Sequence, residues 1–360
     1  MSKLMPTNVP AFLLAASAII PIATTTTTTP AAKQEFRLAM GAILRAQGRD
    51  AQATLKSISP MELDTKDRYF RECALSRLNA TGPLPVTSDT PDVNVFTRNL
   101  LQLYRTYWRT SALNNDSRPA AERALIDGLA KLLGHPVSNI AEAEPLIAAR
   151  LTSYGLFSLE GRTGVLHDLM IWSRNTQKIE QVPLPEGSNA THVNYLDGFI
   201  SRGWSSYLTC NRTGTGGWTT TEGLFVIVPS YKSLTDENFR VNFLAHESQH
   251  YSDKKRFGDM PSWQLEYRAK LVEIIYADTT RDRVLDAFAN NQGDDPSDPH
   301  SYADKRVLTI LMNRLGLTSV ATLHTISIDR LHQTAINVLK ADSVALDTAR
   351  HAKLRPYPLK

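Results

Sequence analysis

The stretch Phe243-Leu244-Ala245-His246-Glu247-Ser248-Gln249-His250-Tyr251 contains the pattern His-Glu-x-x-His and indicates a helix. Residues four apart lie on one face of a helix, so His246 and His250 point the same way. Two imidazoles on one helical face can bind a single Zn²⁺ ion. Glu247 lies beside the first of them, where its carboxylate can accept a proton from a metal-bound water. This stretch is therefore the centre of a candidate catalytic zinc site.

A catalytic zinc site needs a third protein ligand and a position left for water. The segment 263–290 predicts a long helix that carries Glu266 and Glu273, seven residues apart and on one face. Ala269 lies between them, and a small residue there lets two helices approach closely. We favour Glu266 as the third ligand and keep Glu273 as the alternative. A second carboxylate near a metal-bound histidine commonly accepts a hydrogen bond from it without binding the metal itself.

Over residues 220–290 the chain resembles the gluzincin class of zinc metallopeptidases. In that class His-Glu-x-x-His is paired with a glutamate on a following helix, and the matching positions here are His246, Glu247, His250 and Glu266 with Ala269. The resemblance implies a zincin-like fold, a Zn²⁺ cofactor and a peptide or protein substrate. It also implies that Glu247 is the general base in hydrolysis of the peptide bond.

Other zincin patterns fit less well. The metzincin continuation requires Gly at 253 and His at 256, where this chain has Asp253 and Arg256. Asp259 is a minor alternative ligand. Hydrolysis also needs a donor that stabilises the oxyanion. We name His300 as the candidate, and Tyr251, Tyr267, Tyr276 and Tyr302 are also in range by sequence.

The pattern of apolar residues predicts an α+β protein that is mainly α-helical. Helices are expected through most of 33–155 and again beyond 263. Residues 164–172 have short apolar character, Tyr207–Cys210 is interpreted as a strand, and 218–228 ends in a strong strand. We therefore expect a small antiparallel sheet next to the zincin-like active-site helices, with an edge strand that could pair with an extended peptide.

The first 32 residues form a separate unit in the sequence. The apolar run 11–23, the six threonines of 24–29 and the small residues that follow are typical of a cleaved signal peptide and a Thr-rich linker. We therefore expect a secreted or periplasmic protein with no stable membrane span in its mature form. Cys73 and Cys210 permit one disulfide in such a compartment, although the sequence does not show that they meet.

The resulting division is 1–32 as signal peptide and linker, 33–155 as an N-terminal helical region, and 156–360 as a zincin-like metallopeptidase domain. A net charge of +4, from 40 basic and 36 acidic residues, argues against a nucleic-acid partner. Two alternatives remain. One is a helical interaction module, with a partner surface at 33–155 and a structural or inactive zinc site. The other is a zinc hydrolase that acts on a non-peptide amide.

Overall fold

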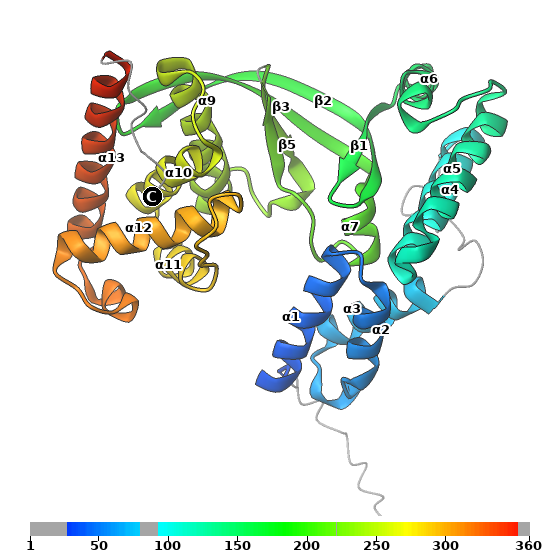
Figure 1. The fold of residues 1–360 in the computed structure, drawn as a ribbon, viewed down its shortest axis with the longest axis horizontal. Coiled ribbons are helices and arrows are strands. Elements are labelled where there is room, and N and C mark those ends of the chain that lie inside the picture. The colour runs from blue at the N-terminus through cyan, green and yellow to red at the C-terminus, as the bar shows by residue number, and fades with distance from the viewer. Residues whose placement is uncertain (1–26, 80–92, 221, 352–360) are drawn as a thin grey trace, which may run out of the picture.

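The computed structural model describes residues 27–79, 93–220 and 222–351, and these residues form a mainly helical α+β protein (Figure 1). Most of the predicted signal peptide, residues 80–92 and the last nine residues lie outside the described residues. No helix in the described ranges is long and apolar enough to cross a membrane.

Six helices precede the sheet and enclose the first part of the core. They are α1 Pro30–Leu44, α2 Gly48–Ser57, α3 Thr65–Asn79, α4 Val95–Leu113, α5 Arg118–Leu133 and α6 Ile140–Thr152. Side-chain caps fix several of their starts: Asn94 accepts from the amide of Thr97, and Asn139 accepts from that of Glu142. Helix α1 begins two residues before the predicted boundary at 32, and Ala32 is buried in this core.

Five strands form one mixed sheet in the order β1-β2-β3-β5-β4. Their bounds are β1 Phe157–Thr163, β2 Leu166–Leu184, β3 Gly187–Arg202, β4 Gly217–Thr220 and β5 Gly223–Ile227. The prediction of a small antiparallel sheet is wrong in two respects. Strands β3 and β5 pair in parallel, and β2 and β3 form a hairpin long enough to curl over the molecule (Figure 1).

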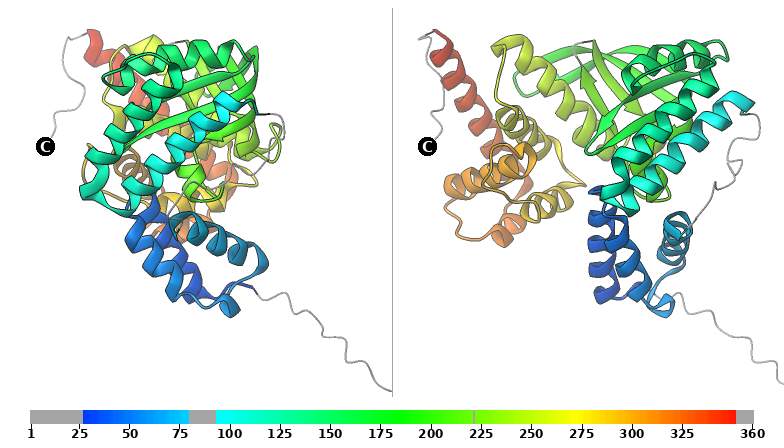
Figure 2. Two further views of the ribbon diagram at one scale, coloured as in Figure 1. Left: turned by 90° about the vertical axis from the view of Figure 1, so that its right-hand side faces the viewer. Right: turned by 45° about the vertical axis from the view of Figure 1, so that its right-hand side comes forward.

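The β2–β3 hairpin joins the two groups of helices. Its base packs with β1 and α7 Gly203–Leu208 against the first six helices, so their apolar core extends past residue 155. Tyr207–Cys210 was predicted as a strand, but Tyr207 and Leu208 end α7. The hairpin tip lies over the C-terminal helices, and Figure 2 shows the same arrangement from two further sides.

The helices after the sheet surround a second apolar core. They are α8 Glu237–Phe239, the π-helical turn η4 Arg240–Ala245, α9 His246–Phe257, α10 Ser262–Tyr276, α11 Arg281–Ala289, α12 Pro299–Leu315 and α13 Ile328–His351. Short 3₁₀ turns complete the chain: η1 Pro60–Glu62, η2 Asn115–Ser117, η3 Val228–Ser230 and η5 Val320–Thr325.

A buried arginine fastens the hairpin tip to these helices. Arg268 of α10 donates to Asp253 of α9 and to Asp342 of α13, each at 2.8 Å. It also lies 3.2 Å from Glu186, which is in the turn between β2 and β3. Four elements therefore meet at one guanidinium group, and this fixes the position of α9 relative to the sheet.

Candidate metal centre

The His-Glu-x-x-His stretch opens α9, directly after a π-helical turn. Asp236 caps the helical segment by accepting from the amide of Phe239 at 3.0 Å. Residues 240–245 then follow π geometry, and α9 begins at His246. An inserted π turn rotates the residues that follow it around the helix axis, and such turns are frequent at functional sites. A hydrogen bond between Thr191 of β3 and Ser248, 3.2 Å long, also ties α9 to the sheet.

The three predicted metal ligands converge on one point. The Nε2 atoms of His246 and His250 are 3.0 Å apart, and the Glu266 carboxylate oxygens lie 3.4 Å and 3.3 Å from them. Donor atoms placed tetrahedrally around Zn²⁺ lie about 3.3–3.6 Å from one another, because each is about 2.0–2.2 Å from the metal. The two distances to Glu266 fall in this range, whereas the 3.0 Å between the histidine nitrogens is shorter, so the three side chains are close to the spacing of zinc ligands. All three side chains are largely buried.

The two candidate glutamates of α10 lie on different sides of His246. Glu266 belongs to the cluster of possible ligands, whereas Glu273 lies 2.7 Å from Nδ1 of His246. A proton on Nδ1 donated to Glu273 leaves the Nε2 lone pair facing the cluster. Ala269 is fully buried between the two glutamates, and α10 packs against α9. The arrangement thus fits Glu266 as ligand and Glu273 as the group that orients His246.

The carboxylates make a cation favourable at this position. Burial by itself would lower the pKa of His246, but hydrogen bonds with Glu266 and Glu273 outweigh it and raise that pKa to about 10. Burial would raise the pKa of Glu266, but hydrogen bonds from His246, His250 and His300 bring it well below the ordinary range. The same negative charge that holds a proton here would stabilise a divalent ion.

The candidate general base lies beside the edge strand of the sheet. The hydroxyl of Thr219, in β4, donates to the carboxylate of Glu247. Strand β4 pairs with β5 on one side and is the last strand of the sheet. An extended peptide that paired with its open side would lie next to Glu247.

His300 is the one oxyanion candidate that the structure brings to the metal cluster by an observed contact. It lies at the start of α12, and its Nδ1 is 3.0 Å from Glu266. Its side chain is 61% exposed, so it approaches the cluster from the solvent side. Tyr302 instead packs edge-on against Trp263, and Tyr276 lines a cavity beside η4.

Tyr231 is a neighbour of Glu247 that the sequence analysis did not consider. Burial raises the pKa of Tyr231, and the charge of Glu247 raises it further. The ring packs against Phe239 and Phe243, which holds it beside η4. A signal was present in the sequence, since Tyr231 lies between the strong strand 224–228 and the helix that carries His246 and His250.

The remaining acidic candidates have other positions. Asp253 accepts from Gln249 and Arg268, both at 2.8 Å, and so belongs to the buried arginine network. Asp259 is exposed in the turn between α9 and α10, and it is not among the clustered ligands found in the described residues.

The Nδ1 atom of His250 is buried and has no hydrogen-bond partner in the described part of the chain.

A separate cavity of about 780 Å³ lies beside η4. It is bounded by β2, β3 and η4, with Lys178, Tyr195 and Arg240 among its lining residues. His246, His250 and Glu266 are not among the described residues that line it, so its volume says nothing about access to the metal cluster.

Comparison of the chain with protein-family models, with curated proteins and with solved structures gives no match. The functional interpretation therefore depends on the side chains of this chain and on the geometry described above.

Proposed function

We propose that this protein is a zinc-dependent metallopeptidase of the gluzincin type. The observation that carries the proposal is the convergence of His246, His250 and Glu266, whose nitrogen and oxygen atoms lie 3.0, 3.4 and 3.3 Å from one another, with Glu247 next to them in the sequence. Two imidazoles and one carboxylate are a donor set typical of catalytic zinc. When bound, zinc lowers the pKa of a coordinated water and polarises a carbonyl group.

The side chains of the protein supply the rest of the chemistry. Glu247 accepts the proton from the attacking water, and its hydrogen bond to Thr219 keeps the carboxylate in place. The open side of β4 binds an extended peptide through main-chain hydrogen bonds. His300 donates to the carbonyl oxygen of the substrate, since its ring is next to Glu266 and 61% exposed to solvent.

A structural zinc site is the main alternative, and the donor set argues against it. Structural sites use four protein ligands, most often with cysteine. Both cysteines of this chain are joined to each other, and the cluster found in the described residues has three members. The edge strand beside Glu247 also favours a peptide over a non-peptide amide, since a backbone substrate can extend the sheet.

The proposal is tested with purified protein and the variants Glu247→Gln and Glu222→Gln. Glu222 is an exposed carboxylate in the turn between β4 and β5, so its variant is the control. We expect Glu247→Gln to keep stoichiometric zinc, measured by elemental analysis, and to cleave an unfolded protein about 10²–10⁴-fold more slowly. Full activity in Glu247→Gln would contradict the role of the base, and wild-type protein without zinc would contradict the proposal as a whole.

A second pair of variants separates the two glutamates of α10. Glu266→Gln removes a ligand and should abolish tight zinc binding. Glu273→Gln removes only the partner of His246 and should weaken zinc affinity about 10–100-fold. If the two effects are reversed, Glu273 is the ligand and the assignment of Glu266 is wrong.

A further inference from the structure

The open edge of β4, beside the candidate general base, has few main-chain groups that a peptide can reach. Strand β4 is the last strand of the sheet and pairs with β5 in an antiparallel register. Along an antiparallel pair the residues alternate. The N–H and C=O of one residue point at the partner strand, and those of the next point away from it. The direction of every residue of β4 therefore follows once one hydrogen-bonded pair is known.

The start of the β4–β5 pairing identifies that pair. The amide of Ile227 donates to the carbonyl oxygen of Gly216 at 2.9 Å, immediately before β4 begins. Counting along the register from this pair, the main-chain groups of Gly217 and Thr219 point away from β5. Those two residues therefore face the open edge, and they are the places where an added peptide strand could form hydrogen bonds.

Gly217 is already engaged by a side chain of the same segment. The hydroxyl of Thr215 accepts from the amide of Gly217 at 3.2 Å and donates to the carbonyl oxygen of Gly217 at 2.6 Å. One hydroxyl therefore occupies both groups that a substrate residue would need there. A threonine that bonds to nearby main chain in this way competes with pairing by another strand.

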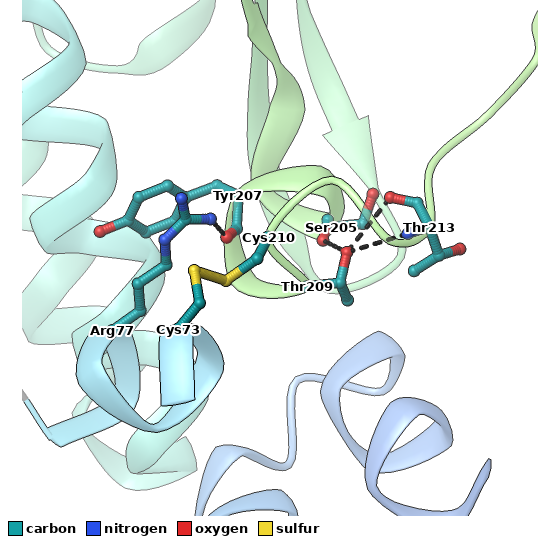
Figure 3. Close-up of a disulfide and its surroundings, with 7 residues drawn as sticks. All are labelled: Cys73, Arg77, Ser205, Tyr207, Thr209, Cys210 and Thr213. Atoms are coloured by element: carbon teal, nitrogen blue, oxygen red, sulfur yellow. Dashed lines mark hydrogen bonds between the residues drawn. A yellow bond between two sulfur atoms is a disulfide. The ribbon is translucent and has the colours of Figure 1, made fainter. Parts of the chain in front are cut away.

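The segment that carries Thr215 is held at both ends. The disulfide between Cys73 and Cys210 attaches its start to α3 (Figure 3). The amide of Thr213 donates to the hydroxyl of the residue that follows α7, at 3.2 Å (Figure 3). Ser230, after β5, donates to the carbonyl oxygen of Thr215 at 3.1 Å. The hydroxyl is therefore positioned at Gly217 by the fold around it.

Thr219 is the other residue at the open edge, and it also contacts the base. In the described part of the chain no hydrogen bond outside the β4–β5 pairing involves its main-chain N–H or C=O. Its hydroxyl points to α9 and donates to the carboxylate of Glu247. A substrate residue paired with Thr219 would therefore be bound by the same residue that positions the base, which fixes the distance between the two.

We propose that β4 pairs with a single substrate residue, at Thr219, and that the Thr215 hydroxyl ends the pairing at that point. The proposal rests on the metallopeptidase function proposed above, and it identifies Thr215 as a residue that limits how the peptide is recognised. Extending the peptide past Gly217 should add no main-chain hydrogen bonds to β4, because the groups there are occupied.

The test is an N-methyl scan of a bound peptide. The probe is a fluorescein-labelled peptide selected from a random-sequence library by binding to zinc-loaded Glu247→Gln protein, in which the peptide stays intact. Each main-chain amide of the peptide is N-methylated in turn, and affinity is measured by fluorescence anisotropy. We expect one sensitive amide in the segment paired with β4, where affinity falls about three- to tenfold through loss of a hydrogen bond.

Adding Thr215→Val to the Glu247→Gln protein removes the hydroxyl and leaves the side chain almost the same size. We expect the unmodified peptide to bind about three- to tenfold more tightly, because Gly217 is then available for pairing. A second sensitive amide should appear two residues from the first. Thr215→Ser in the same background is the control, since it keeps the hydroxyl and should match the parent protein in affinity and in the scan.

Each other result would overturn the proposal. Two sensitive amides two residues apart with Thr215 intact would show that pairing runs past Thr219. A scan and an affinity that Thr215→Val leaves unchanged would show that the hydroxyl limits nothing. No sensitive amide, or no peptide selected from the library, would remove β4 as the place of pairing. Failure of the metallopeptidase function is recognised separately, by wild-type protein that lacks zinc or cleaves no unfolded protein. Circular dichroism first checks the fold of the variants, and Thr215 is exposed.

Discussion

The helices before the sheet and those after it contain different kinds of buried side chain. In the first group the buried residues are mostly apolar, and α3 is attached to the segment after α7 by a disulfide. In the second group many buried residues are ionisable and paired with one another. They are Asp253, Arg268, Lys270, Glu273, Asp304 and Asp342, together with His246 and His250.

This difference has a physical reason. A buried charge is costly unless it is paired, so the many buried ionisable side chains of the second group need partners. Glu273 supports His246, and Arg268 holds α9 and α10 to α13 and to the hairpin tip. The first group has no such demand on its core, and its stability comes from apolar packing and a covalent link.

The largest expected effect comes from breaking the charged network at Arg268. Arg268→Leu leaves Asp253 and Asp342 buried without their partner, and we expect a loss of about 3–5 kcal/mol in the free energy of unfolding. Because α9 carries both histidines, zinc affinity should fall as well. Urea denaturation and zinc analysis measure the two effects.

The matched control is Arg306→Leu in α12. Arg306 is exposed and lies over the rings of Trp263 and Tyr302, so its loss should cost about 1 kcal/mol or less. Equal destabilisation by the two variants would mean that the buried network contributes no more than a surface contact. The contrast between the two groups of helices would then be wrong.

The next effect in size comes from removing the disulfide. The double variant Cys73→Ser and Cys210→Ser should lower the free energy of unfolding by about 2–4 kcal/mol, because it frees two segments that are 137 residues apart in sequence. We expect zinc content to remain at the wild-type level, since the bridge joins elements of the first group. Loss of zinc in this variant would show that the two regions are not energetically separate.

Part of this fold could be predicted from the sequence. Apolar spacing and capping residues were sufficient for most of the helices. The segment 263–290 was predicted as one long helix, but it forms α10 and α11 with a break between them. The segment 218–228 was predicted to end in one strong strand, but it is divided between β4 and β5. The long hairpin was missed beyond residue 172, because Ser173 to Lys178 has no alternation of apolar and polar residues and much of this stretch is exposed. Tyr207 was misassigned because a bulky aromatic residue favours a strand locally, whereas burial against Trp108 selects a short helix.

The candidate site was more predictable than the sheet. The spacing of His246 and His250 is a property of one helix, and a seven-residue spacing placed Glu266 and Glu273 on one face of another. The choice between those two glutamates depends on how α9 and α10 pack, which the sequence does not encode locally. The contact between Thr219 and Glu247 likewise depends on tertiary structure.

The smallest predicted effect tests a partly buried acid in β1, which packs against the first group of helices. Glu160 of β1 is partly buried, and burial, with a further contribution from the charge of Glu144, raises its pKa to about 7. Its Oε1 atom has no hydrogen-bond partner among the described residues. Tyr104, whose hydroxyl is also buried without such a partner, interacts with this carboxylate. Glu160 and Tyr104 therefore differ from Asp253 and Asp342, whose carboxylates are paired with Arg268.

The sign of the pH dependence follows from the direction of that shift. The folded protein binds the Glu160 proton more tightly than the unfolded chain does, so wild-type stability falls as pH rises from about 4.5 to about 7. In the Glu160→Gln variant the side chain carries no charge at any pH in this range. Relative to wild type it should therefore gain stability over this range, by on the order of 2 kcal/mol at pH 8. Urea denaturation at pH 5 and pH 8 measures the gain, with Glu72→Gln, at an exposed position of α3, as control. A difference between wild type and Glu160→Gln that is independent of pH would mean that the carboxyl is as well solvated in the folded protein as in the unfolded chain. The contrast in buried charge would then rest on the second group of helices alone.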